Sequence, residues 1–152
     1  MNVRNKKVSR ILVVVFVAIT GVVCGLGSYT FIYANGVSYL SNDPKSCINC
    51  HVMREQFVDW NHSSHKSFAT CNDCHAPRDF IGKWSSKAIN GWNHSLAFTT
   101  GNFPDPIRIN DFNRKIVQDN CVGCHKTFLN NTIHRKTQKE LRCIECHRDI
   151  GH

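Results

Sequence analysis

Residues 47–53 read Cys47-Ile48-Asn49-Cys50-His51-Val52-Met53, and the rest of the chain is organised around this stretch. Its Cys-x-x-Cys-His pattern recurs at Cys71–His75, Cys121–His125 and Cys143–His147. Eight of the nine cysteines in this 152-residue chain lie in the four copies, and Cys24 is left over. Only the first copy has a methionine two residues after its histidine.

Paired cysteines at this spacing also occur in zinc ribbons and in disulfide frameworks. Neither of those needs a histidine directly after every second cysteine, and all four copies have one. Two thiols three residues apart can form thioethers to one haem, and the next histidine can bind its iron. We therefore expect four covalently bound haem c groups, attached by Cys47, Cys50, Cys71, Cys74, Cys121, Cys124, Cys143 and Cys146.

The formal net charge is +8, which by itself favours nucleic acid or anionic lipid as a partner. Haem propionates would offset much of this charge. The sequence has no interleaved basic and aromatic platform either, so we expect no nucleic-acid partner.

Residues 1–10 are basic with no acidic residue, and residues 11–34 carry no charge. Twenty-four uncharged, mostly apolar residues can cross a bilayer as a helix. A cleaved signal peptide usually has a shorter apolar run, so we favour an uncleaved anchor that ends in interfacial aromatics. We expect a cytoplasmic basic N-terminus at 1–10, a transmembrane anchor helix at 11–40 and an exported tetrahaem cytochrome c domain at 41–152.

The predicted fold class is mainly α with long loops: one N-terminal transmembrane helix followed by a small tetrahaem c-type cytochrome domain. The exported part is too small to enclose four macrocycles and also build an ordinary apolar core. Asp43 is a predicted helix N-cap, with Pro44 at the first helical position. The first motif follows the anchor so closely that its haem must lie near the membrane surface.

A 45-residue insert, Ala76–Asn120, separates the second and third motifs. Its segment from Trp84 to Phe98 has amphipathic spacing and predicts a helix with a break at Gly91. Two tryptophans and a lysine favour a position in the membrane interface, although packing against haem remains open. Residues 101–106 are a predicted loop.

The chain has five histidines outside the motifs, and bis-histidine ligation is the ordinary route to a low-potential haem. They are His62, His65, His94, His134 and His152. A chain that ends on a histidine right after a haem motif suggests a ligand folded back to another haem. Met53 competes with His51 for one haem face or merely packs there, and the sequence leaves both options open.

Three segments together resemble the NapC/NirT family of membrane-anchored quinol dehydrogenases over nearly the whole chain. They are the first motif with Met53 after a single span, the second motif preceded by His65, and Lys87-Ala88-Ile89-Asn90-Gly91-Trp92-Asn93-His94. The resemblance implies a first haem that accepts electrons from quinol, with Met53 able to replace His51 as iron ligand. Lys87 matches a lysine of the quinol site.

The same resemblance implies the remaining ligands. His94 occupies a distal position where some relatives have aspartate, so whether it binds iron, takes a quinol proton, or does both stays open. His65 would pair with His125 on the third haem, and His152 with His75 on the second. His147 would hold the fourth, whose open side would take a partner lysine or His134. His62 is expected to be a surface residue.

We therefore expect a cytochrome that oxidises menaquinol from the lipid and passes electrons to a periplasmic multihaem reductase, with cytochrome c nitrite reductase favoured. The expected quinol-site residues are Lys87, His94 and Met53. The expected place is the bacterial cytoplasmic membrane, with the haem domain in the periplasm and an oligomer within the complex. An anchored electron carrier without its own quinol site, serving nitrate or another reductase, is the alternative. A terminal catalytic cytochrome is less favoured.

Overall fold

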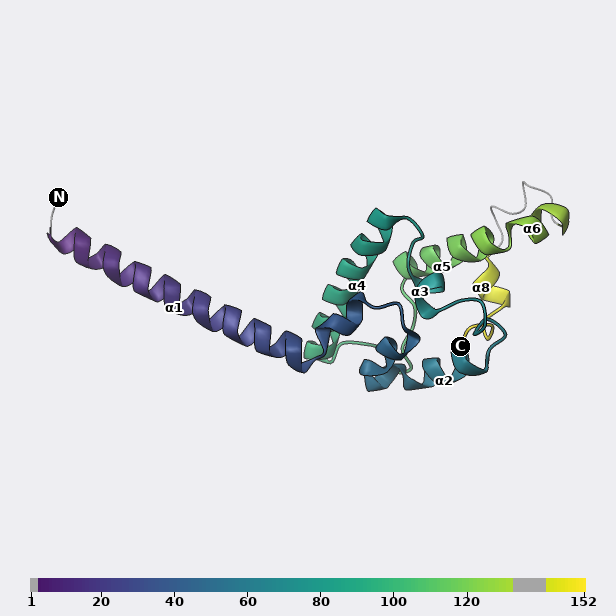
Figure 1. Ribbon diagram of the computed structural model, residues 1–152, viewed down its shortest axis with the longest axis horizontal. Coiled ribbons are helices and arrows are strands. Elements are labelled where there is room, and N and C mark those ends of the chain that lie inside the picture. The colour runs from purple at the N-terminus through teal and green to yellow at the C-terminus, as the bar shows by residue number, and fades with distance from the viewer. Residues whose placement is uncertain (1–2, 133–141) are drawn as a thin grey trace. The chain divides into compact units, whose positions relative to one another are not determined.

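The computed structural model describes residues 3–132 and 142–152, and within these ranges every regular element is helical (Figure 1). The expected mainly helical fold is thus confirmed, while the alternative ligand His134 lies outside the described residues. The α-helices are α1 (Val3–Tyr33), α2 (Arg54–His62), α3 (Cys71–His75), α4 (Phe80–Thr100), α5 (Asp111–Cys124), α6 (Lys126–Thr132) and α8 (Cys143–Cys146). Short 3-10 helices span η1 (Gly36–Leu40), η2 (Pro44–Asn49) and η3 (His51–Met53).

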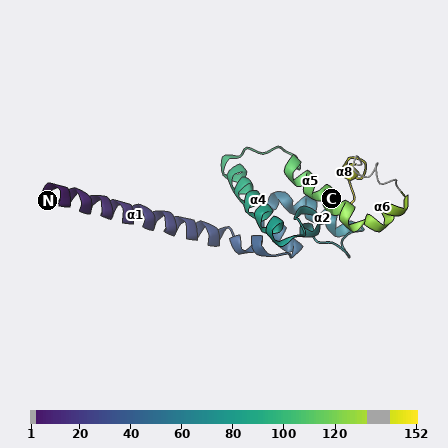
Figure 2. The same cartoon turned by 90° about the horizontal axis from the view of Figure 1, so that it is seen from above.

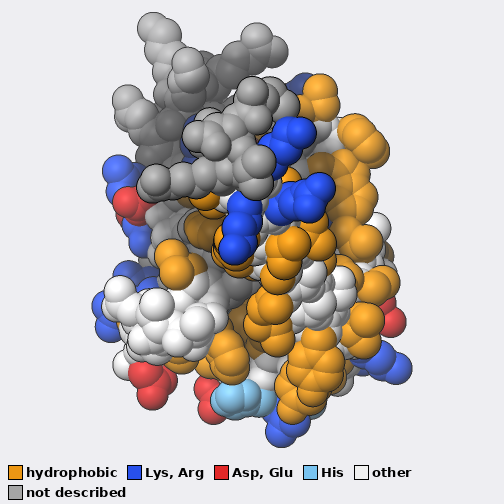
Figure 3. All heavy atoms as spheres, turned by 90° about the vertical axis from the view of Figure 1, so that its left-hand side faces the viewer, with side chains coloured by type: hydrophobic (Ala, Val, Ile, Leu, Met, Phe, Trp, Pro, Cys, Tyr) orange, Lys and Arg blue, Asp and Glu red, His pale blue; other side chains and the backbone are white. Residues whose placement is uncertain are grey.

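The chain divides into two compact units, Met1–Leu40 and Ser41–His152. In the first, Lys6–Tyr33 has a mean hydropathy of 2.6 and is long and apolar enough to cross a membrane. Its large apolar side chains are exposed on all sides, as Phe16 and Ile32 illustrate. A helix that is apolar all round needs a cover of lipid or protein. The space-filling view shows large hydrophobic patches at the surface, with few acidic side chains among them (Figure 3).

Helix α1 ends at Tyr33, so the expected continuation to about Leu40 is wrong. Asn35 adopts the left-handed conformation with φ 50°, which ends the α-helix, and the chain goes on as the 3-10 helix η1. A Cβ at Gly36 would collide with the Phe31 ring, so this turn requires glycine.

The second unit has almost no apolar core within the described residues. Ala76 and Ile116 are the buried hydrophobic side chains there, and the other buried side chains are the polar Ser86, Lys87 and Asn120. Burial of apolar area normally supplies most of the stability of a domain. The second unit therefore depends on polar contacts between elements and on whatever its motifs hold.

Asp43 caps η2 as expected, because its carboxylate accepts the Lys45 backbone N–H at 2.9 Å with Pro44 at the start of the helix. Helix α3 has a capping box, in which the Asp73 carboxylate accepts both the backbone N–H and the hydroxyl of Thr70 at 2.7 Å. These bonds from Thr70 lower the pKa of Asp73. Local capping thus holds the first two motifs in short helices.

Helix α4 is uninterrupted, so the expected break at Gly91 is wrong (Figure 2). One interior glycine costs only about 1 kcal/mol relative to alanine, which 21 residues with good ends can absorb. Asp79 caps the N-terminus by accepting the Gly82 N–H at 2.6 Å, and Gly101 ends the helix with φ 67°. The expected loop at 101–106 follows.

The two sides of α4 differ sharply in exposure. Ser86 and Lys87 are buried, with exposed fractions of 2% and 9%. Phe80, Trp92 and Phe98 are exposed by 77%, 72% and 67%. The buried side places Lys87 inside the second unit, and the apolar side is open; its interfacial position stays a prediction.

Candidate haem and electron-entry site

Lys87 lies inside the second unit, beside the first motif. Its ammonium donates to the Ser41 carbonyl at 3.0 Å and stands 5.6 Å from the centroid of the Trp84 ring. Burial lowers the pKa of Lys87, and the neighbouring charge of Lys83 lowers it further. The carbonyl and the aromatic face compensate part of the desolvation of this cation.

Electrostatics link Lys87 directly to Cys47 of the first motif. The pKa of the Cys47 thiol is lowered to about 7, mainly by a hydrogen bond with Cys71 and also by the Lys87 charge. Met53 is half-buried and His51 is exposed on η3. The structure thus brings Lys87 to the first motif, as the sequence led us to expect for an electron-entry site.

His94 follows Lys87 by seven residues on the same helix. Seven residues are nearly two turns, so both side chains project from about the same side of α4, roughly 10 Å apart along its axis. His94 is exposed at the surface, yet neighbouring atoms bury part of it and lower its pKa. A lowered pKa keeps the imidazole neutral, the form that accepts a proton.

His75 and His152 face each other across 77 positions of sequence. Their Nε2 atoms are 3.4 Å apart, and their rings are nearly parallel at 14° with centroids 5.6 Å apart. The pKa of His75 is lowered to about 4, first by burial and then by the charge of His152. Neutral imidazoles are the form that ligates metal. An atom held between two nitrogens at metal–nitrogen distances of about 2 Å separates them by about 4 Å, so a small shift would admit iron here.

His65 and His125 are the second pair that the fold brings together. Their ring centroids are 6.2 Å apart, and the rings are steeply inclined at 73°. The two pairs join the second and third motifs to a histidine from elsewhere in the chain. They differ clearly in the relative orientation of their rings.

The motif cysteines lie next to one another in chain order. Cys47 hydrogen-bonds with Cys71. Cys74 is close enough to Cys124 for its pKa to rise, although burial is the larger cause. The pKa of Cys121 is likewise raised, first by burial and then by Cys143. The first motif therefore adjoins the second, the second the third, and the third the fourth.

All nine cysteines lie in the described part of the chain and none forms a disulfide there. The residues therefore fit covalent haem: each motif has free thiols, and two motif histidines face a second imidazole. The sparse apolar core leaves the same unit without another filling. His51 and His147 are exposed, with no such pairing apparent among the residues that the structure describes.

Three amide side chains that the sequence did not single out join neighbouring motifs. Asn72, inside the second motif, donates to the Ser41 carbonyl at 3.1 Å and to Asn42 Oδ1 at 3.0 Å, just before the first motif. Asn120 and Gln118 on α5 bind the second and fourth motifs. Asparagine and glutamine are common at protein surfaces, so no sequence pattern distinguishes these three.

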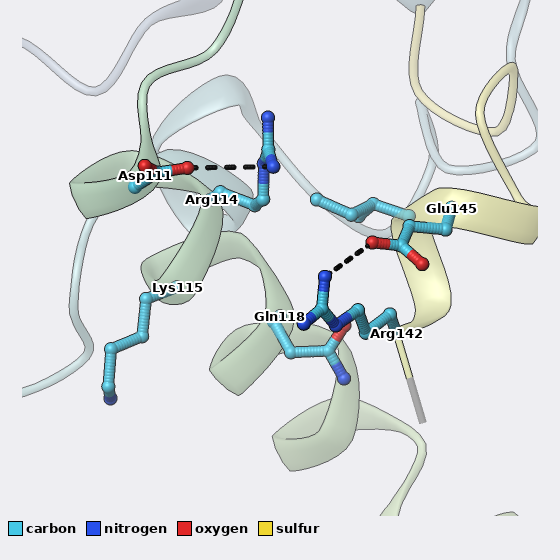
Figure 4. Close-up of a pocket in the computed structure, with 7 residues that line it drawn as sticks. Asp111, Arg114, Lys115, Gln118, Arg142 and Glu145 are labelled. Carbon is cyan, nitrogen blue, oxygen red and sulfur yellow. Dashed lines mark hydrogen bonds and ion pairs between the residues drawn. The ribbon is translucent and has the colours of Figure 1, made fainter. Parts of the chain in front are cut away.

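A cavity of about 270 Å³ opens between α5 and α8, next to the fourth motif (Figure 4). Arg142 pairs with Glu145 at 2.9 Å and Arg114 with Asp111 at 3.5 Å, whereas Lys115 points away from them. A second cavity of similar size follows the C-terminal half of α4 from Asn93 to Asn102. Neither cavity is lined by Lys87 or His94.

His62 behaves as the expected surface residue. It is exposed, and its Nδ1 bonds to the Val58 carbonyl of its own helix at 2.8 Å. A histidine tied to its own turn is poorly placed to reach a distant iron.

Comparison with known proteins agrees with this site. Residues 5–152 match the family described as NapC/NirT cytochrome c family, N-terminal region. The chain is 39% identical over 155 residues to the cytochrome c-type protein NrfH of Wolinella succinogenes, covering 95% of this chain and 88% of that one. It is 34% identical over 119 residues to the cytochrome c nitrite reductase subunit NrfH of Nitratidesulfovibrio vulgaris, covering 78% and 72%.

The fold is also similar to that in a crystal structure of the cytochrome c nitrite reductase NrfHA complex bound to the HQNO inhibitor. The TM-score is 0.64 at 27% identity, and the match covers 88% of each chain. With its apolar N-terminal helix and its Cys-x-x-Cys-His motifs, the chain belongs to the NapC/NirT cytochrome c family and is a membrane-anchored cytochrome with covalently bound haem c.

Proposed function

We propose that this chain oxidises menaquinol at the bacterial cytoplasmic membrane and passes the electrons through four haems to a periplasmic cytochrome c nitrite reductase. The names of the two NrfH relatives and of the related complex support the choice of reductase. The observation that carries the proposal is the placement of buried Lys87 beside Cys47, in the motif nearest the membrane anchor.

The orientation follows from charge and cofactor chemistry. The basic residues before α1 stay in the cytoplasm by the positive-inside rule. Residues 41–152 are then in the periplasm, where haem c is attached to its cysteines. The same reasoning puts the first motif close to the lipid that carries quinol, because seven positions separate Leu40 from Cys47.

Eight cysteines would hold four haems, one at each motif. Bound haem supplies one-electron redox chemistry, which splits the two-electron oxidation of quinol into single transfers. The paired imidazoles of His75 with His152, and of His65 with His125, would hold the irons at the second and third motifs. His51 or Met53 would serve the first, and His147 the fourth.

Lys87 and His94 would act on the quinol itself. Oxidation of quinol to quinone releases two electrons and two protons, and the protons need an acceptor. The neutral His94 imidazole can take a proton from a quinol hydroxyl and release it to the periplasm. The Lys87 ammonium can leave the Ser41 carbonyl and donate a hydrogen bond to a quinol oxygen, which orients the ring and favours loss of its proton.

The test uses the full-length haem-loaded chain with its reductase in lipid vesicles. We expect His94→Ala to slow menaquinol-driven nitrite reduction by about 100-fold, in the range of a lost general base, and Lys87→Gln to slow it as well. Reduction driven by a soluble dye should be unchanged in both. Lys83→Gln, one turn earlier on α4, is the matched control for charge.

Normal quinol oxidation by both variants would refute the proposed site. It would favour the alternative of an anchored electron carrier that receives electrons from another membrane complex. Binding of HQNO, the inhibitor of the related complex, provides an independent check. HQNO should perturb the spectrum of the haem at Cys47 and Cys50, and Lys87→Gln should weaken that effect.

A further inference from the structure

Helix α5 carries two amide side chains just before the third motif, and each contacts a different neighbouring motif. Asn120 immediately precedes Cys121, and Gln118 lies two residues further back. One reaches the second motif and the other the fourth. The helix that carries the third motif thus holds both of its neighbours.

Asn120 grips the backbone on both sides of His75. Its side-chain amide donates to the Cys74 carbonyl at 3.0 Å and to the Ala76 carbonyl at 2.9 Å. Asn120 has an exposed fraction of 7%. Because both donors are used and water is largely excluded, loss of this side chain would leave two carbonyls without these partners. The backbone that carries the His75 imidazole is therefore fixed to α5.

Gln118 holds the start of the fourth motif in a two-point contact. Its Oε1 accepts the Cys143 backbone N–H at 2.8 Å, and its Nε2 donates to Cys143 Sγ at 3.3 Å. A thioether sulfur is still a weak acceptor after haem attachment. None of the contacts of Gln118 or Asn120 uses a thiol hydrogen or an imidazole nitrogen, so all of them are compatible with bound haem.

We propose that Asn120 and Gln118 are positioning residues for electron transfer, which set the second and fourth haems against the third. This inference rests on the proposed four-haem relay. Transfer between redox centres slows steeply with their separation, and groups that orient metal ligands tune the metal they hold. Without an apolar core to fix the motifs, these amides are the contacts that determine the spacing.

The chain offers a matched control on the same helix. Asn113 on α5 exchanges two amide hydrogen bonds with Asn90 on α4, at 2.9 and 3.0 Å. This pair is also partly buried, but it touches no motif backbone. Asn113→Ala should therefore cost a similar amount of packing without moving a haem.

The experiment compares Asn120→Ala, Gln118→Ala and Asn113→Ala in the full-length haem-loaded protein. We expect Asn120→Ala to shift the electron paramagnetic resonance signal and midpoint potential of the haem held by His75. Gln118→Ala should shift those of the haem at Cys143 and Cys146. Electron transfer through the shifted haem should slow by about 10- to 100-fold, and Asn113→Ala should change none of these properties.

Unchanged signals, potentials and transfer rates in Asn120→Ala and Gln118→Ala would overturn the proposal, as would equal shifts in Asn113→Ala. Should either alanine variant fail to load haem, Asn120→Ser and Gln118→Glu replace it. Each keeps part of the contact, and an unchanged haem signal there also refutes the proposal. Because dye is the reductant throughout, a failed quinol site would not affect these measurements.

Discussion

Among single side chains, the pairing of His75 with His152 says most about the haems. Two imidazoles with Nε2 atoms 3.4 Å apart and a depressed pKa of about 4 on one of them repel as cations and are poor mutual partners when neutral. A metal between them resolves this conflict, because both nitrogens then act as acceptors. The geometry therefore favours a ligand role over a structural hydrogen bond.

Ring orientation gives the two pairs separate spectroscopic signatures. Nearly parallel imidazoles and steeply inclined ones give different low-spin ferric signals, and the pairs here stand at 14° and 73°. We expect His152→Ala to abolish the signal of the near-parallel type and to leave the inclined type in place. Electron paramagnetic resonance of the oxidised protein measures both, with His62→Ala as the surface control. Loss of the inclined signal instead would reverse the assignment.

His94 sets the expected pH dependence of quinol oxidation. Its pKa lies below the ordinary value of about 6.5 because of burial. A base acts in its neutral form, so the rate should be at its plateau near neutrality and fall only at pH values below about 6.5. His94→Gln should remove this acidic limb. A rate that still halves between pH 7 and pH 6.5 in the wild type would contradict the depressed pKa.

Helices show where sequence patterns succeed and where they stop. Asp43 with Pro44 was readable because capping is local chemistry within one turn. The break at Gly91 and the run of α1 to Leu40 were not, because each depends on a sum over many residues or on a turn conformation such as that of Asn35. Lys87 was found by resemblance. Asn120 could not be found, since its partners lie 44 and 46 positions away.

The start of α4 gives a stability prediction that runs against helix propensity. A Cβ at Gly82 would fall within 3 Å of both carboxylate oxygens of Asp79, the N-cap. We expect Gly82→Ala to lose a cap worth about 1 kcal/mol and so to cancel its gain in propensity. In an Asp79→Ala background the same change should stabilise by up to about 1 kcal/mol. Thermal unfolding of the four variants tests this, and simple additivity would refute it.

For the molecule as a whole, the motif contacts imply one series rather than a cluster. Each neighbouring pair is joined by nearby cysteines and by one amide, from Asn72 at the first junction to Gln118 at the last. No described contact joins the first motif to the third or fourth. Electrons that enter beside Lys87 then have one order of travel, and the third motif is a step that they cannot avoid.

Removal of that step separates the two ends of the molecule. In a Cys121→Ala, Cys124→Ala variant we expect menaquinol still to reduce the first two haems, while quinol-driven nitrite reduction falls to background. Haem content should drop from four to three, and optical spectra under anaerobic quinol report the reduced fraction. Cys24→Ala, at the cysteine outside the motifs, should leave both activities intact. A reductase that still receives quinol electrons at the normal rate through the three-haem variant would show that the third motif is not in the path.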